Sequence, residues 1–165
     1  VSPEARSAAK SGRWQALPKL DLTPRTAAEL KEAMPGVQSN LDRYEWTKHG
    51  SCYPARDAET YFRDSLRLLQ AVNGSAVRDL MAASIGREIG STEIRRAFDD
   101  AFGEGAGERV RIACRDDGPR RLITEISIGL AGDISAGTEV SDLILASGPA
   151  DPGCPGGVVD PAGLQ

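Results

Sequence analysis

The pattern of apolar residues changes once along this chain of 165 residues, at about residue 109. Before that point, amphipathic segments alternate with the Pro, Gly, Ser and Asn residues that start and end helices. After it, "ERVRIACR" alternates apolar and charged residues, and "RRLITEISIGL" follows the turn "DDGP" as a β-branched strand. The two segments predict a hairpin with Cys114 near the end of its first strand. Helices followed by strands indicate an α+β domain, with an antiparallel sheet packed against several helices.

Capping residues predict five helices between residues 23 and 102. They are, in order, a helix after Thr23 that stops at Pro35-Gly36, a helix from about Leu41 to His49 capped by Ser39 or Asn40, a segment after Asp57 closed by Asn73-Gly74, a helix after Ser75, and a helix over Thr92–Phe102 capped by Ser91. The tail is largely irregular and allows a short strand at Val158-Val159.

The composition, 40% apolar and 27% charged, is that of an ordinary soluble globular protein, and residues 1–165 are expected to form a single domain. The net charge of −4 argues against partners held by bulk electrostatics, such as duplex DNA or an anionic membrane. The 20 Lys and Arg residues still allow a locally basic cleft. No apolar stretch approaches the roughly 20 residues that span a bilayer, so no membrane association is predicted.

The stretch "EWTKHGSC" concentrates chemistry-bearing residues around the only histidine of the sequence. On a helix, Glu45, Lys48 and His49 project within about a 100° arc together with Leu41. Trp46 points elsewhere and is expected to anchor the opposite face in the core. Such a face is commonly a solvated surface, with an ion pair worth a few tenths of a kcal/mol. Its place at the end of a short helix, where clefts form, favours catalysis instead.

Other chemistries receive little support from the sequence. His49 and Cys52 alone do not make a zinc site, and neither a metal nor a cofactor is predicted. A nucleophilic pair of these two residues is conceivable, but a structural disulfide is the more frequent role of such a cysteine. The glycine-rich "GEGAGE" follows a helix and precedes a strand, which is the wrong order for a phosphate-binding loop.

The segment "YEWTKHGSC" resembles the second active-site segment of the ribonuclease T2 family, His-Glu-Trp-x-Lys-His-Gly-Thr-Cys. Six of its eight specified positions match: Glu45, Trp46, Lys48, His49, Gly50 and Cys52. Ser51 stands for the threonine and Tyr44 for the leading histidine. The stretches "MPGVQSNLDRYEW", "CYPARDAETYFRDSLRLL", "VRIACRDDG" and "GCPGG" also resemble exported bacterial members, so the resemblance covers most of the chain.

The resemblance implies a metal-independent endoribonuclease with an acidic optimum and an α+β fold. Such an enzyme cleaves single-stranded RNA by transphosphorylation through a 2′,3′-cyclic phosphate, and the need for a 2′-hydroxyl excludes DNA. In this chemistry His49 is the general base, while Glu45 and Lys48 support the transition state. The alternative is a catalytically inactive module on the same fold that binds RNA or a protein.

Two positions depart from what the resemblance implies for substrate binding. Tyr44 replaces a histidine that helps to bind phosphate, and a phenol donates one hydrogen bond without a positive charge. Tyr44 is therefore expected to bind phosphate weakly, or else to be a partly buried aromatic residue that packs beside Lys48. Leu41 stands where many relatives carry an aromatic residue that contacts a base, so the base preference stays open.

The family also needs a second histidine, the general acid, from a segment of the form His-Gly-Leu-Trp-Pro. These 165 residues contain no such segment. The resemblance implies that they form the C-terminal major part of the domain, and that an N-terminal segment or a separate chain supplies both this histidine and a cysteine that pairs with Cys52. By themselves the 165 residues are expected to be a poor ribonuclease.

The three cysteines indicate the compartment. Cys154 lies in "ADPGCPGG", a loop too rich in Pro and Gly for regular hydrogen bonding, where a cysteine stabilises most as half of a disulfide. The resemblance implies that its partner is Cys114. The same features favour an exported protein, secreted or periplasmic, that acts as a monomer.

Overall fold

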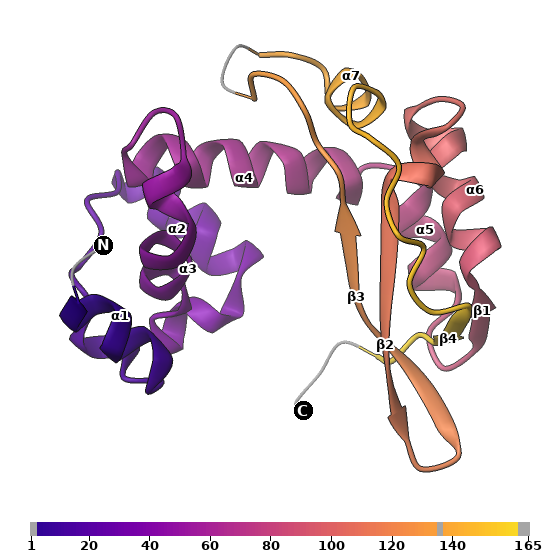
Figure 1. Ribbon diagram of the computed structural model, residues 1–165, viewed down its shortest axis with the longest axis horizontal. Helices are drawn as coiled ribbons and strands as arrows, with labels where there is room; N and C mark the ends of the chain where they lie inside the picture. Colours follow the sequence, from indigo (N-terminus) through magenta and orange to yellow (C-terminus); the bar gives the residue numbers. More distant parts are fainter. Residues whose placement is uncertain (1–2, 135–136, 162–165) are drawn as a thin grey trace. The chain divides into compact units, whose positions relative to one another are not determined.

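The computed structural model describes residues 3–134 and 137–161 (Figure 1). The chain divides into two compact units, residues 1–69 and residues 70–165, and the boundary falls inside the long helix α4 (Ala58–Asn73). The first unit is helical and the second holds the sheet (Figure 1). No helix of the described ranges has the length and hydropathy to cross a membrane.

The first unit packs short helices against the N-terminal part of α4. Its other elements are α1 (Pro3–Lys10), η1 (Trp14–Ala16), α2 (Pro24–Ala33), η2 (Pro35–Ser39), α3 (Leu41–His49) and η3 (Gly50–Cys52). The core of the unit forms around Leu30 of α2 and two residues of α4, Phe62 and Leu66. These two lie four positions apart and therefore share one face of the helix. The predicted helices over α2, α3 and α4 are confirmed.

A carboxylate joins the start of α2 to the first turn of α4. Glu59 accepts hydrogen bonds from the backbone N–H of Thr23 at 2.9 Å, from its hydroxyl at 3.1 Å and from the Thr26 hydroxyl at 2.6 Å. Thr23 is the N-cap of α2, as predicted, because its hydroxyl accepts a hydrogen bond from the backbone N–H of Thr26. The hydrogen bond from Thr26 and those from Thr23 hold the pKa of the Glu59 carboxyl below its usual value.

The start of α3 depends on a backbone conformation. Asn40 adopts φ 60° and ψ 32°, the left-handed region that asparagine tolerates better than most residues. Its backbone N–H donates to the carbonyls of Gly36 and Val37 at the end of η2, and α3 begins at the next residue. The predicted cap is therefore at the right position, but its side chain makes no capping hydrogen bond. Asn40 acts by turning the chain.

The second unit is built around a four-stranded sheet of order β1-β4-β3-β2. Its elements are α5 (Ala76–Ala83), β1 (Glu88–Gly90), α6 (Ser91–Phe102), η4 (Ala106–Arg109), β2 (Val110–Asp117), β3 (Arg120–Ile128), α7 (Val140–Leu145) and β4 (Gly156–Val158). The expected hairpin of β2 and β3 is antiparallel, whereas β4 pairs with β3 in parallel at Leu122 and Val158. Helices α5 and α6 lie side by side next to the sheet (Figure 1). The predicted α+β class is confirmed.

Two boundaries differ from the prediction. Helix α6 begins at Ser91, so its N-cap is Gly90 and not Ser91. The N–H of Ser91 donates a hydrogen bond to the carbonyl of Pro155 at 2.8 Å, where β1 ends. Strand β2 continues to Asp117, so Cys114 lies in its middle and not near its end. The ladder shifts register between Ala113 and Cys114, which is a β-bulge.

The core of the second unit joins α6 and α7 to the sheet. Its fully buried members include Ile94, Phe98, Val110, Ile112, Leu143 and Ile144. Along β2 buried Val110 and Ile112 alternate with exposed Arg111, as the sequence pattern predicts. Cys114 and Cys154 form a disulfide with their Cα atoms 6.0 Å apart, so the predicted pairing is confirmed.

Candidate active site

Helix α3 is anchored by Trp46, which packs against the Leu30, Phe62 and Leu66 core as predicted. Gly50, the residue directly after α3, has no room for a side chain. An ideal Cβ on Gly50 would lie 2.1 Å from Cε3 of the Trp46 ring. The Trp46 indole therefore packs directly against the backbone of Gly50, where α3 ends and η3 begins. His49 is the last residue of α3.

The segment before α2 holds the other side of α3. The Arg43 guanidinium donates through Nη1 to the carbonyls of Gln15 at 3.2 Å and Leu17 at 3.1 Å. The Trp14 ring stacks on Tyr44, with centroids 5.1 Å apart and planes 26° apart. Hydrogen bonds from the Arg43 side chain to backbone carbonyls, together with ring stacking, thus fix the helix that carries the predicted catalytic residues.

Glu45 and His49 meet as the helical spacing predicts. Nε2 of His49 lies 3.4 Å from Oε2 of Glu45. The histidine side chain is 49% exposed and the glutamate 27%, so a substrate could reach the imidazole while the carboxylate stays partly sheltered. A carboxylate beside an imidazole can accept a hydrogen bond from a ring N–H and so orient the ring.

Lys48 takes a different neighbour. Its ammonium lies over the Tyr44 ring, 5.4 Å from the centroid, a cation–π distance. In the part of the chain that the structure describes, Lys48 forms no ion pair with Glu45. The Tyr44 ring therefore contacts both Trp14 and Lys48. This geometry agrees with the packing role considered for Tyr44, and its contact with phosphate remains a prediction.

Helix α4 supplies an aromatic wall that the sequence alone did not reveal. The Tyr61 ring contacts Trp46, Tyr53 and Phe62. Burial raises the pKa of the Tyr61 phenol, and the nearby charge of Glu45 raises it further. This phenol therefore stays protonated next to the Glu45 carboxylate.

A second phenol on this wall is fixed by α4 itself. The Tyr53 hydroxyl donates to Oδ2 of Asp64. Asp64 follows Tyr61 by three positions, so both face the same side of α4. No local signal in the sequence could have paired residues 53 and 64.

Leu41 lies one turn before Glu45 and is half-buried. An ideal Cβ on Gly36 would lie 2.6 Å from Cδ2 of Leu41, so the Leu41 side chain packs closely on the backbone of η2. Contact with a base remains a prediction. Cys52, the last residue of η3, is exposed, and its pairing with a cysteine outside these residues also remains a prediction. The described residues contain no group of three or more His, Cys, Asp or Glu able to hold a metal ion.

Comparisons with known proteins agree with the site. A family profile described as the Ribonuclease T2 family matches residues 14–142, so the chain belongs to this family, as the resemblance of the segment around His49 indicated. Ribonuclease I of Escherichia coli (strain K12) is 33% identical over 133 residues. The match covers 79% of this chain and 47% of that protein, so the chain spans about half the length of this relative.

Proposed function

We propose that this chain carries the base side of the active site of an endoribonuclease. Its substrate is single-stranded RNA, which it cleaves by transphosphorylation through a 2′,3′-cyclic phosphate. The observation that carries the proposal is the 3.4 Å contact of Glu45 with His49, next to Lys48, in a family of ribonucleases. The identity to a protein named ribonuclease I supports the same conclusion.

The roles follow from the charges that move during the reaction. His49 accepts the proton of the 2′-hydroxyl, because a neutral imidazole has a ring nitrogen that can act as a general base. Glu45 orients the ring and balances the charge that it gains. Lys48 stabilises the negative charge that develops on the phosphoryl oxygens. No step in this scheme requires a metal, and an acidic optimum is part of the proposal.

The 5′-oxygen that leaves also needs a proton. The 165 residues contain one histidine, which is already used as the base. We therefore assign the general acid to a histidine outside them, on a segment of the His-Gly-Leu-Trp-Pro form. A cysteine near that segment is the proposed partner of Cys52.

Export is also part of the proposal. The Cys114–Cys154 disulfide supports an oxidising compartment, because cytosolic reductants keep most thiols reduced. We place the protein in the periplasm or outside the cell, acting as a monomer.

The alternative is a module on this fold that binds RNA or a protein without cleaving it. The two functions separate in one experiment on the 165-residue chain. With a chain carrying the His-Gly-Leu-Trp-Pro segment added, an enzyme regains cleavage of single-stranded RNA that the 165 residues alone lack. A binding module stays inactive under both conditions.

The catalytic assignment is tested by His49→Ala in the intact protein, assayed on single-stranded RNA at pH 5. We expect kcat to fall by about 10²–10⁴-fold, the usual contribution of a general base. Lys31→Ala removes an exposed cation from α2 and should leave kcat unchanged. Near-normal cleavage by a folded His49→Ala protein would show that His49 is not the base.

A further inference from the structure

The charge of the molecule is divided unevenly between its two units. Residues 1–69 contain 11 Lys and Arg against 9 Asp and Glu, a net charge of +2. Residues 70–165 contain 9 against 15, a net charge of −6. The acidic balance of the whole chain therefore belongs to the second unit, and the unit with the candidate active site is basic. Such asymmetry favours a polyanionic ligand on the first unit.

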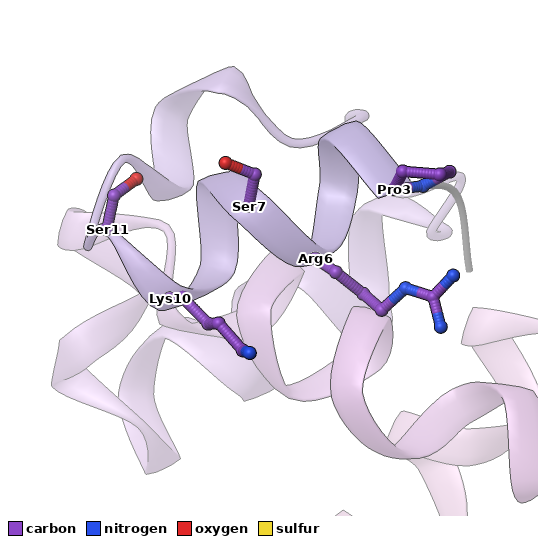
Figure 2. A pocket seen from close by; sticks show the side chains of 5 residues that line it. All are labelled: Pro3, Arg6, Ser7, Lys10 and Ser11. Atoms are coloured by element: carbon purple, nitrogen blue, oxygen red, sulfur yellow. The ribbon is translucent and has the colours of Figure 1, made fainter.

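Part of this basic charge surrounds an open depression on α1, with a volume of about 530 Å³. Its lining is Pro3, Arg6, Ser7, Lys10 and Ser11 (Figure 2). Arg6 and Lys10 lie four positions apart, and Figure 2 shows both side chains leaving the same side of the helix. Arg13 adds a third cation at the rim, since its Nε donates to the Ser11 hydroxyl at 3.0 Å.

The side chains of the depression suit an anion. The lining residues that the structure describes include two cations, Arg6 and Lys10, and two serines. Arg6 and Lys10 are exposed, and within the described ranges neither forms an ion pair with an acidic side chain. Guanidinium, ammonium and hydroxyl donors together are the groups that bind the phosphates of a nucleic acid strand.

The depression is close in the fold to the candidate active site. Helix α1 contacts α3, as Figure 1 also shows. Four residues after Lys10, Trp14 stacks on Tyr44, which in turn holds the ammonium of Lys48. The cations of α1 and those of α3 thus belong to one connected part of the first unit.

We propose that Arg6, Lys10 and Arg13 form a phosphate-binding subsite for the RNA backbone, outside the phosphodiester that reacts. The subsite rests on the proposed function only for the identity of its ligand, single-stranded RNA. Cations that follow a strand bind it without regard to sequence and with strong salt dependence. The subsite therefore favours long substrates over dinucleotides and does not affect the chemical step.

The test uses a fluorescent 2′-O-methyl RNA of twelve nucleotides, which cannot be cleaved because its 2′-oxygens carry no proton. Its binding to the protein is measured by fluorescence anisotropy over a series of salt concentrations. In Arg6→Ala/Lys10→Ala we expect Kd to rise roughly tenfold at low salt and the salt slope to fall by about 1.4, for two lost phosphate contacts. The matched control Arg25→Ala/Lys31→Ala removes two exposed cations from α2 and should bind as the unaltered protein does.

Cleavage assays provide the second measurement. In the intact protein, which includes the segment that carries the general acid, Arg6→Ala/Lys10→Ala should raise KM for a twelve-nucleotide RNA and leave kcat unchanged. A dinucleotide should be cleaved at the normal rate. An unchanged Kd and salt slope would overturn the subsite, as would an equal loss in the α2 control. If the subsite is right but the proposed function is wrong, the result is different. The unaltered protein then binds the uncleavable RNA through α1 but cleaves neither substrate.

Discussion

Gly50 is required by close packing and not by its backbone conformation. Its φ of −62° is available to every residue, but a Cβ would overlap the Trp46 ring. The glycine that follows His49 therefore allows the indole to fill the space between α3 and the core. A residue of the candidate active-site segment thus contributes by leaving space for the Trp46 ring that anchors the helix.

Gly50→Ala should force the Trp46 ring to move and lower the free energy of unfolding by about 1–3 kcal/mol, the usual cost of overpacking. Urea unfolding measures this change. Gly148→Ala is the matched control, because a Cβ at residue 148 meets no atom within 4 Å. Equal stability of the two variants would contradict the packing argument.

Tyr44 has two candidate roles that two substitutions can separate. If the ring positions Lys48, Tyr44→Phe keeps the cation–π contact and its kcat/KM should stay within about twofold of the unaltered protein, whereas Tyr44→Leu should lose about two- to fivefold. If the hydroxyl binds phosphate, Tyr44→Phe should be as impaired as Tyr44→Leu. The contact of Lys48 with the ring favours the first outcome. Steady-state kinetics on a short RNA decide between them.

At the scale of elements, α2 and α4 are joined by the hydrogen bonds to Glu59. The same two helices enclose the core on which Trp46 packs, so this polar contact indirectly supports α3. The pKa of Glu59 is lowered in the folded state, so its carboxylate stabilises the fold above the pKa of the unfolded chain. That contribution is lost as the pH falls through the folded value.

Glu59→Gln should therefore destabilise the protein by about 1 kcal/mol at pH 7, because hydrogen bonds to a charged acceptor are lost. The difference from the unaltered protein should be smaller when unfolding is measured at pH 3, because acidification protonates the carboxyl and removes the charged acceptor. Urea unfolding at the two pH values checks this. The control Glu29→Gln breaks an exposed pair with Arg25 and should change stability little at either pH. A difference that grows on acidification would contradict the assignment.

At the scale of the whole molecule, the disulfide ties the irregular tail to the hairpin. Cys114 and Cys154 are separated by 40 residues. Nearby, the N–H groups of Ile112 and Cys154 reach the carbonyls of Pro152 and Ile112. The tail is thus held by one covalent bond and by backbone hydrogen bonds at the same strand.

Removing this bond in Cys114→Ala/Cys154→Ala should lower the free energy of unfolding by about 3–4 kcal/mol in the loop-entropy model. Thermal unfolding under non-reducing conditions measures the loss. Peptide mapping of the unaltered protein is the direct check on the pairing. A peptide that links Cys52 to either of the other two cysteines would refute it.

Much of the architecture could be predicted because its signals are local. Thr23 caps α2, Gly50 follows α3, and Asp57 caps α4 by accepting from the Thr60 N–H at 2.7 Å. Each of these interactions joins residues close in sequence. The alternation along β2 and the motif around His49 are local in the same sense.

Helix α1, helix α7 and strand β1 escaped prediction. Helix α7 and strand β1 contain 6 and 3 residues, too few for a periodic pattern to distinguish. Helix α1 has 8 residues, as many as α5, which was predicted from its cap Ser75. Their structure depends on what they pack against. Strand β1 exists because β4, almost 70 residues later, pairs with it.

At the candidate site, the sequence by itself determined the meeting of Glu45 with His49, because helix geometry brings positions four apart together. Only the tertiary structure decided that Lys48 lies over Tyr44 and that Trp14 covers that ring. It also decided that Tyr61 lies near Glu45. These neighbours come from separate elements, and their contacts form only when the apolar faces of those elements are buried together.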